Sequence, residues 1–447
     1  MPTLTLSDPL PALRASAHRL TGSLEDFDPL LAQVGDARYA LIGEASHGTH
    51  EFYRIRAAIT KRLVLEKGFA AVAVEADWPD ANRVHRYVTG ADDDPGAIES
   101  LQGFVRFPQW MWRNADVLDF IGWLRAHNDA LPPTIPRVGF YGLDLYSLHA
   151  SIDAVLRYLR VVDPEAARRA AERYACFDAY GQDLQAYGHA ATLGLAPTCE
   201  REVLAQLLDL RRAAADYARR DHRVTPDDLF FAEQNARLIA DAEQYYRAMF
   251  QSYESSWNLR DRHMAGTLGA LMTHLASRMP TPKVVVWAHN SHIGDARATE
   301  RHRAGELNLG QLVRERVGAA AVLVGFSTYS GTVTAASNWD EPAERKRVRP
   351  ALPHSYEALF HDLGTPNFLL APAQAAVREA LGHPRLQRAI GVIYRPETER
   401  QSHYYHVQLP AQFDAILHYD VTRAVEPLER AGLWERGELP ETFPSAL

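Results

Sequence analysis

The chain has little of several features that define whole classes of protein. Only two of its 447 residues are cysteine, too few for a disulfide framework or a thiolate zinc site, and this favours a reducing compartment. No run of 18 apolar residues occurs, so we expect no membrane span. The first twenty residues lack the basic and apolar regions of a signal peptide. These absences predict a cytoplasmic protein.

Positive charge is also scarce. The sequence has 48 Lys+Arg against 56 Asp+Glu, a formal net charge of −8. Binding to nucleic acid or to a membrane surface needs a basic face, so we expect neither partner. Apolar residues make up 47% and charged residues 23%, which is ordinary for a globular protein and excludes a disordered or fibrous one. No glycine-rich phosphate-binding loop is present.

Short apolar runs that end abruptly in polar residues predict the strands of a sheet. The clearest runs are 37–43, 70–74, 137–142, 283–288 and 319–326, and weaker ones follow at 367–370, 389–394 and 413–419. Most are continuously apolar, which is typical of strands covered on both faces. Helical patterns, such as that of 51–67, lie between them. The alternation predicts an α/β fold with a mostly parallel sheet flanked by helices.

The middle of the chain has a different composition. Residues 148–277 show no convincing strand and are rich in Ala, Leu, Arg and Glu. We interpret this part as a large all-helical insertion that forms a lid or cap, and we assign 1–147 and 278–447 to the α/β catalytic core. Cys176 and Cys199 fall within the insertion and are expected to be core or surface thiols. The charged, proline-bearing segment 341–353 is expected to be a loop.

Ionisable and polar residues follow each of the five clearest strand signals. They are Glu44 and His47 after the first, Glu75 and Asp77 after the second, Asp144 after the third, His289, Asn290 and His292 after the fourth, and Ser327 after the fifth. In open parallel sheets, ligands bind in the crevice beyond the carboxyl ends of the strands. We therefore expect these side chains to converge on one cleft.

The spacing of Glu44 and His47 suggests acid–base chemistry. They are three residues apart across a strand-to-helix turn, so the carboxylate could orient the imidazole and help it take a proton from water. Arg56, one helical step from Phe52, could pair with a carboxylate at the cleft. A structural alternative remains open, in which His47 only caps the turn and Glu44 only pairs with Arg56.

Two further alternatives concern the kind of site. Glu44, His47, His289 and His292 together supply four possible ligands for a zinc or iron centre. The protein could also be a non-enzymatic module that binds haem or a small molecule. Clustered carboxylates favour chemistry over simple binding, because several ionisable groups are costly to bury.

Aromatic residues are concentrated in two stretches, 104–112 and 245–257. They could line an apolar pocket for a bulky ligand, and Trp110 is the member that we place against substrate. The alternative is that most of them pack between helices. A further cluster at 403–406 is assigned to the pocket rim or to packing.

Five segments resemble the erythromycin esterase family, which includes proteins labelled as succinoglycan-biosynthesis-like. They are GEASHGTHEFYRIR (43–56), VAVEADWPDANRV (72–84), GFYGLDLYSL (139–148), NLRDRHMA (258–265) and VVVWAHNSHIGD (284–295). The resemblance spans most of the chain. It implies a cofactor-free, metal-independent hydrolase that opens the ester of 14-membered macrolides, although a shared site does not fix this chain's substrate. It also supports a helical lid over the cleft.

The resemblance assigns roles residue by residue. It implies that His47 is the general base with Glu44 beside it, and that Arg56, Glu75 and His289 are the other residues the family needs. His292 also fits the motif, and we place it at the substrate with Asp77 and Asp144. We hypothesise that a water held between His47 and His289 attacks the carbonyl, while Arg56 or a protonated His289 stabilises the oxyanion.

Overall fold

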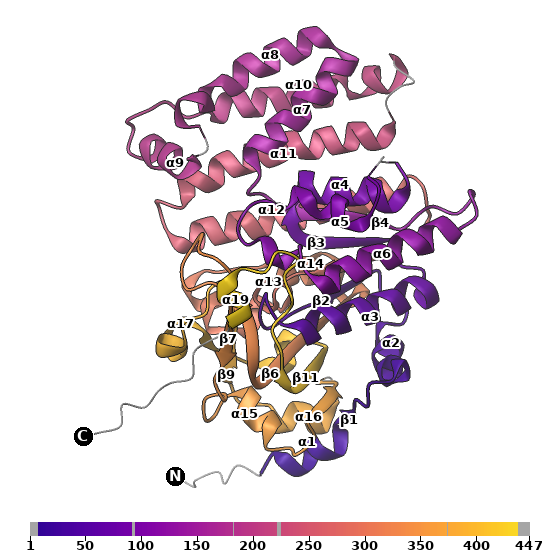
Figure 1. Ribbon diagram of the computed structural model, residues 1–447, viewed down its shortest axis with the longest axis vertical. Helices are drawn as coiled ribbons and strands as arrows, with labels where there is room; N and C mark the ends of the chain where they lie inside the picture. Colours follow the sequence, from indigo (N-terminus) through magenta and orange to yellow (C-terminus); the bar gives the residue numbers. More distant parts are fainter. Residues whose placement is uncertain (1–7, 92–93, 182, 221–224, 373, 437–447) are drawn as a thin grey trace.

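The computed structural model describes residues 8–91, 94–181, 183–220, 225–372 and 374–436. Its described part contains a nine-stranded sheet in the order β1-β8-β11-β6-β2-β5-β3-β4, with β7 paired to β6 (Figure 1). The strands are β1 (His18–Arg19), β2 (Tyr39–Ile42), β3 (Ala71–Asp77), β4 (Gly139–Asp144), β5 (Val284–Trp287), β6 (Ala321–Ala335), β7 (Glu344–Val348), β8 (Asn367–Leu370) and β11 (Ala415–Thr422). A separate antiparallel pair consists of β9 (Arg385–Arg388) and β10 (Tyr404–Val407).

The neighbouring strands from β11 to β4 all run parallel, and β1, β7 and β8 pair antiparallel at the margins. Every residue of β2, β3, β4 and β5 is buried. Side chains alternate along a strand, so Leu41 and Ile42 enter different core clusters on the two faces. The predicted α/β class with a mostly parallel, doubly covered sheet is confirmed.

Helices cover both faces of the sheet (Figure 1). One core contains residues of α2 (Asp28–Val34), α3 (His50–Lys67), α4 (Trp78–Thr89) and α6 (Ala115–Ala130). The other contains residues of α1 (Leu10–Ser16), α14 (Leu309–Val317), α15 (Tyr356–His361), α16 (Ala375–Ala380) and the helices of 148–277. The short helices are α5 (Ala97–Ser100), α13 (Asn290–Ile293), α17 (Glu399–Ser402), α18 (Leu409–Gln412) and α19 (Gly432–Arg436).

The described residues between 148 and 277 form helices and turns and no strand. The helices are α7 (Leu148–Val162), α8 (Pro164–Tyr174), α9 (Leu184–Thr192), α10 (Glu200–Arg220), α11 (Pro226–Ala248) and α12 (Tyr253–Ala276). In Figure 1, α7 to α11 stack beyond the sheet edge, and α12 lies between them and the sheet. The division into core and cap stays a prediction. Within the described ranges, no helix has the length and apolarity to cross a bilayer.

Two predictions near the C-terminus are wrong. Residues 389–394 form only isolated bridges, because Ile390 pairs with the turn at Ser46 and the chain then crosses the end of the sheet. Segment 341–353, expected to be a loop, contains β7, which pairs with the far half of β6. The second half of β6 extends beyond its neighbours β2 and β11. Its backbone hydrogen-bonding groups are therefore available to pair with the polar strand β7.

The prediction that Cys176 and Cys199 are core or surface thiols is also wrong, because they form a disulfide. It joins two turns of the helical region that are 23 residues apart in the chain. The pairing removes one argument for a reducing compartment.

We expect the double variant C176S/C199S to unfold with a free energy lower by about 3 kcal/mol, because the crosslink limits the unfolded chain. Urea titrations of the variant and of the wild type, each with and without reductant, would measure the difference. The reductant should destabilise the wild type alone. Two reactive thiols in the unfolded, unreduced wild type would contradict the pairing.

Candidate active site

A cavity of about 380 Å³ lies where the parallel strands end. Its lining includes six of the predicted residues, contributed by four strand ends: His47 after β2, Glu75 and Asp77 at the end of β3, Asp144 at the end of β4, and His289 and His292 after β5. The expected convergence is therefore present in the structure. The other three predicted residues are not part of the lining: Glu44 bonds to His47, Asn290 to the backbone of Phe326, and Ser327 to His418.

The turn between β2 and α3 fits only because glycine stands at two positions. A Cβ at Gly43 would lie 2.1 Å from the side-chain oxygen of Asn290, and one at Gly48 would lie 1.8 Å from the carbonyl of Thr334. The Tyr53 hydroxyl donates to the carbonyl of His47 at 2.9 Å. These contacts fix the backbone that carries His47, whose side chain lines the cavity.

His47 is oriented by a buried carboxylate. Its Nδ1 lies 2.8 Å from Oε1 of Glu44, and Oε2 of Glu44 lies 3.2 Å from Nη2 of Arg56. Arg56 is fully buried between the rings of Tyr53 and Trp287 and does not line the cavity. Arg56 therefore supports Glu44 from behind, and its expected role as an oxyanion contact is wrong.

Glu75 is the central acceptor of the site. Its carboxylate accepts from the backbone N–H of His289 at 2.8 Å and from Arg260 at 2.7 Å, and it lies 3.3 Å from Nε2 of His292. Its Oε1 is also 3.9 Å from Nε2 of His47. Burial alone would raise the pKa of Glu75, but His292, Arg260 and His47 hold it well below its usual value. Glu75 is therefore ionised.

The two histidines after β5 differ in charge. Burial, with the neighbouring His47, lowers the pKa of His289 well below its usual value, so its ring is neutral. Its Nδ1 accepts from the N–H of Ser291, and its ring lies 4.9 Å from that of His47. Burial opposes the charge of His292 as well, but Asp261 and Glu75 raise its pKa to about 9. The lowered pKa of His289 disfavours the protonated His289 that was expected, and the raised pKa of His292 favours the charged form of that ring instead.

Sequence reasoning missed Arg260 as a site residue. Its guanidinium bridges Asp144 and Glu75, with contacts of 2.6 to 2.9 Å. Asp261, beside it on α12, bonds to Nδ1 of His292 at 2.9 Å. The sequence did contain one indication of Arg260. It is four residues before the buried Met264, so it places a charge on the buried face of a helix.

A second ion pair lines the cavity at Asp77. Arg106 donates from Nε to Asp77 at 2.9 Å. The guanidiniums of Arg106 and Arg260 lie 4.6 and 5.0 Å from the ring centre of Tyr146. Burial raises the pKa of Asp77, and Arg106 opposes that shift. Arg260 outweighs burial at Asp144 and lowers its pKa. Asp77 and Asp144 were predicted to contact the substrate. In the structure they line the cavity and pair with Arg106 and Arg260, respectively.

Aromatic side chains from three parts of the chain wall the cavity: Phe104, Phe107, Trp112, Trp257 and Trp339. Trp110 is not among them, contrary to prediction. It belongs to the 3-10 turn Gln109–Met111 and faces a separate cavity of about 530 Å³, with its ring 5.4 Å from that of Phe107. His403 of the C-terminal aromatic cluster reaches the cavity wall.

The four residues considered as metal ligands do not form a ligand set. Both oxygens of Glu44 face His47 and Arg56, Nδ1 of His289 accepts from backbone, and His292 lies between Asp261 and Glu75. In the described part of the chain, no three His, Cys, Asp or Glu side chains are arranged to hold a metal ion.

The charge of His292 predicts how stability depends on pH. Its pKa is raised from 6.5 to about 9 in the folded protein, so its contribution is complete below pH 6.5 and is lost as the pH rises through about 9. We expect the unfolding free energy of the wild type to fall over this interval more steeply than that of H292Q. The exposed H383Q is the matched control and should follow the wild type, and equal slopes for wild type and H292Q would contradict the assignment.

Known proteins resemble this chain in sequence and in fold. Residues 64–422 match the sequence profile of the erythromycin esterase family. The chain is 23% identical to erythromycin esterase type II of Escherichia coli over 323 residues, which are 70% of this chain and 74% of the relative. A crystal structure of a Bacillus cereus protein superposes with a TM-score of 0.77 at 21% identity, covering 96% of this chain and all of the other. A mutant of the erythromycin esterase EreC in its open conformation gives 0.66 at 18% identity, covering 91% and 96%.

Proposed function

The chain belongs to the erythromycin esterase family, and from that premise we propose that it hydrolyses the ester bond of a small molecule, with His47 as the general base. The observation that carries the proposal is the position of this imidazole. Glu44 holds Nδ1 at 2.8 Å, and Nε2 is directed toward a cavity bounded by Glu75, 3.9 Å away. An imidazole between two carboxylates is suited to accept a proton from water.

The first step is attack by water. Because Nδ1 of His47 donates to Glu44, the neutral ring keeps Nε2 free to take a proton from the water that attacks the carbonyl carbon. The water oxygen forms the new C–O bond, and the carbonyl π electrons move to its oxygen. The imidazolium that results is stabilised by Glu44 and Glu75. Neutral His289 packs against the ring of His47 and fixes its orientation.

The second step is collapse of the tetrahedral intermediate. Arg260 and the protonated His292 line the same cavity as His47 and are fixed by Glu75, so they supply positive charge for the oxyanion. Such preorganised donors typically contribute about 3–4 kcal/mol. The C–O bond to the alcohol then breaks, and the alkoxide takes the proton back from His47. The products are a carboxylic acid and an alcohol.

The wall of the cavity indicates the substrate class. Aromatic rings surround the ionic floor, which suits an ester or lactone with a large apolar part. Macrolides are one candidate class, because the erythromycin esterase of Escherichia coli is a relative. We also propose that α12 acts as part of a cap, because it brings Trp257 and Arg260 to the cavity.

A substrate panel tests the proposal. The purified protein should be assayed with 14-membered macrolides, smaller lactones and aryl esters, before and after dialysis against a chelator. We expect hydrolysis of at least one class, unchanged by the chelator. Loss of activity that returns with one metal would favour a metallohydrolase. Absence of turnover over the whole panel, together with a ligand-induced thermal shift, would favour a binding module.

A further inference from the structure

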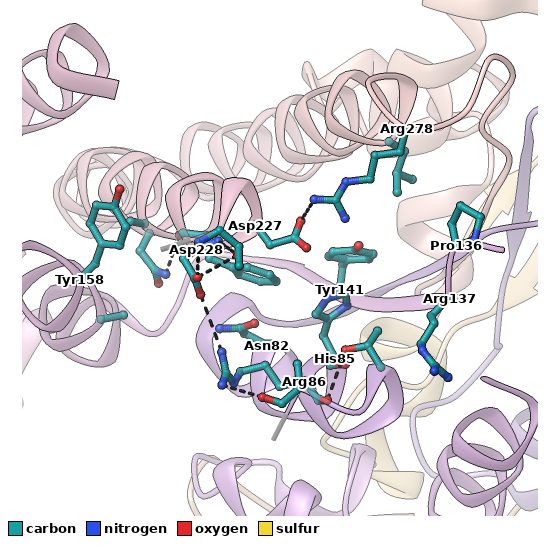
Figure 2. A pocket seen from close by; sticks show the side chains of 18 of the residues that line it. Asn82, His85, Arg86, Pro136, Arg137, Tyr141, Tyr158, Asp227, Asp228 and Arg278 are labelled. Atoms are coloured by element: carbon teal, nitrogen blue, oxygen red, sulfur yellow. Dashed lines mark hydrogen bonds and ion pairs between the residues drawn. The ribbon is translucent and has the colours of Figure 1, made fainter. Parts of the chain in front are cut away.

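A second, larger cavity lies between the sheet edge and the helical region. Its volume is about 1080 Å³, and it shares no lining residue with the candidate active site. Figure 2 shows Asn82, His85 and Arg86 of α4 on one side and Asp227 and Asp228 of α11 on the other, with Tyr141 of β4 between them. The mechanism above uses none of these residues.

Two buried side chains present uncharged hydrogen-bonding groups whose orientation is fixed. Nδ1 of His85 accepts from the N–H of Phe140, so the proton of the neutral ring is on Nε2. Burial lowers the pKa of His85 to about 4, which keeps the ring neutral at pH 7. Nδ2 of Asn235 donates to the carbonyl of Phe231 at 2.8 Å, so its oxygen faces the other way. Asn235 is 2% exposed, and within the described residues that oxygen has no partner.

Aromatic rings form the wall beside these groups. Tyr141 and Phe231 are nearly parallel, with an interplanar angle of 14°, and His85 lies 4.6 Å from the ring of Tyr141. Tyr158 of α7 adds a third ring, and its hydroxyl has no partner among the described residues. Neutral polar groups beside aromatic rings suit the ring of a heterocyclic ligand, which can stack and form hydrogen bonds.

Arginines predominate among the charged side chains that line the cavity. Four arginines line it against two carboxylates: Arg86, Arg137, Arg157 and Arg278 against Asp227 and Asp228. Both carboxylates are already engaged, since Asp227 pairs with Arg278 and His274, and Asp228 caps α11 and lies 3.8 Å from Arg86. Arg137 lies 3.8 Å from Asp129. Arg157 is exposed, and it pairs with no carboxylate of another described residue. A negatively charged group is the complement of this rim.

We propose that this cavity binds a mononucleotide, with its base among the aromatic rings and its phosphate at the arginine rim. The inner donors and acceptors are neutral and the outer groups are cationic, so the occupant needs an uncharged ring at one end and an anion at the other. A nucleoside alone or an inorganic anion alone satisfies only half of the lining. The site is independent of the proposed ester hydrolysis.

Calorimetric titration of the full chain with AMP tests the proposal, with adenosine, ribose 5-phosphate and inorganic phosphate as partial probes. We expect AMP to bind with a Kd below about 1 mM, and each partial probe to bind at least about tenfold more weakly. No binding of AMP at about 5 mM would overturn the proposal. Equal binding of ribose 5-phosphate would overturn it too, because it would remove any role for the base.

Variants locate the binding. R157Q removes an exposed charge and should weaken AMP binding about tenfold without changing adenosine binding. N82A removes a lining amide whose oxygen has no partner among the described residues, so it should weaken the binding of both AMP and adenosine. R201Q is the matched control, because Arg201 is an exposed arginine outside the cavity. Binding that is unaffected by R157Q and N82A, or that is lost in H47A, would place AMP elsewhere and refute the assignment.

Discussion

Replacement of His47 by alanine is expected to lower kcat for ester hydrolysis by a factor of about 10²–10⁴, the usual contribution of a general base. Glu44 orients this ring through Nδ1, and its other nitrogen, Nε2, is directed toward the cavity. Water still enters the cavity of the variant, but the imidazole proposed to take its proton is gone, and Glu75, whose pKa is lowered, is a weaker base. Initial rates on the best ester of the panel would measure the loss.

The control is H50A. His50 lies three residues away at the start of α3, where it pairs with Asp116 at 2.8 Å, and it does not line the cavity. Its removal should leave kcat within about twofold of the wild type, and circular dichroism should show both variants folded. Full activity in a folded H47A protein would end the proposal that His47 is the base.

The sheet and the strand-end residues were predictable from the sequence for a physical reason. A strand covered on both faces must be continuously apolar, so the run 283–288 identified β5 to within one residue at each end. Parallel strands bring their carboxyl ends to one edge, so His289 and Glu75 could be expected to meet although they are 214 residues apart. The contact between Glu44 and His47 follows from their spacing within one turn.

The other members of the site depend on tertiary packing, which the local pattern does not encode. Arg260 reaches Glu75 from a helix 185 residues further along the chain, and nothing in its own segment fixes which strand that helix will cover. Which cavity Trp110 faces depends on the short 3-10 turn Gln109–Met111. The disulfide depends on how the helical region brings Cys176 and Cys199 together. The pKa values of the histidines also depend on tertiary contacts, because Asp261 raises the pKa of His292 whereas burial lowers that of His289.

Replacement of Arg260 by methionine is expected to lower the free energy of unfolding by about 3–5 kcal/mol and to abolish hydrolysis. Methionine keeps much of the apolar volume, but it leaves Asp144 buried without its main cation and Glu75 buried with one cation fewer. Removing one partner is the costly way to break a buried ion pair. The same change removes the positive charge proposed for the oxyanion. Urea denaturation and the ester assay would measure the two effects.

A compensating variant separates stability from chemistry. In R260M/D144N the second substitution removes one stranded carboxylate, so we expect part of the lost stability to return while hydrolysis stays absent. R173Q is the control for losing a partly buried arginine, because Arg173 pairs with Asp209 far from the cavity. If R260M were as stable as R173Q, Arg260 would not be the main cation of the buried Asp144. Recovered hydrolysis in the double variant would show that Arg260 takes no part in the chemical step.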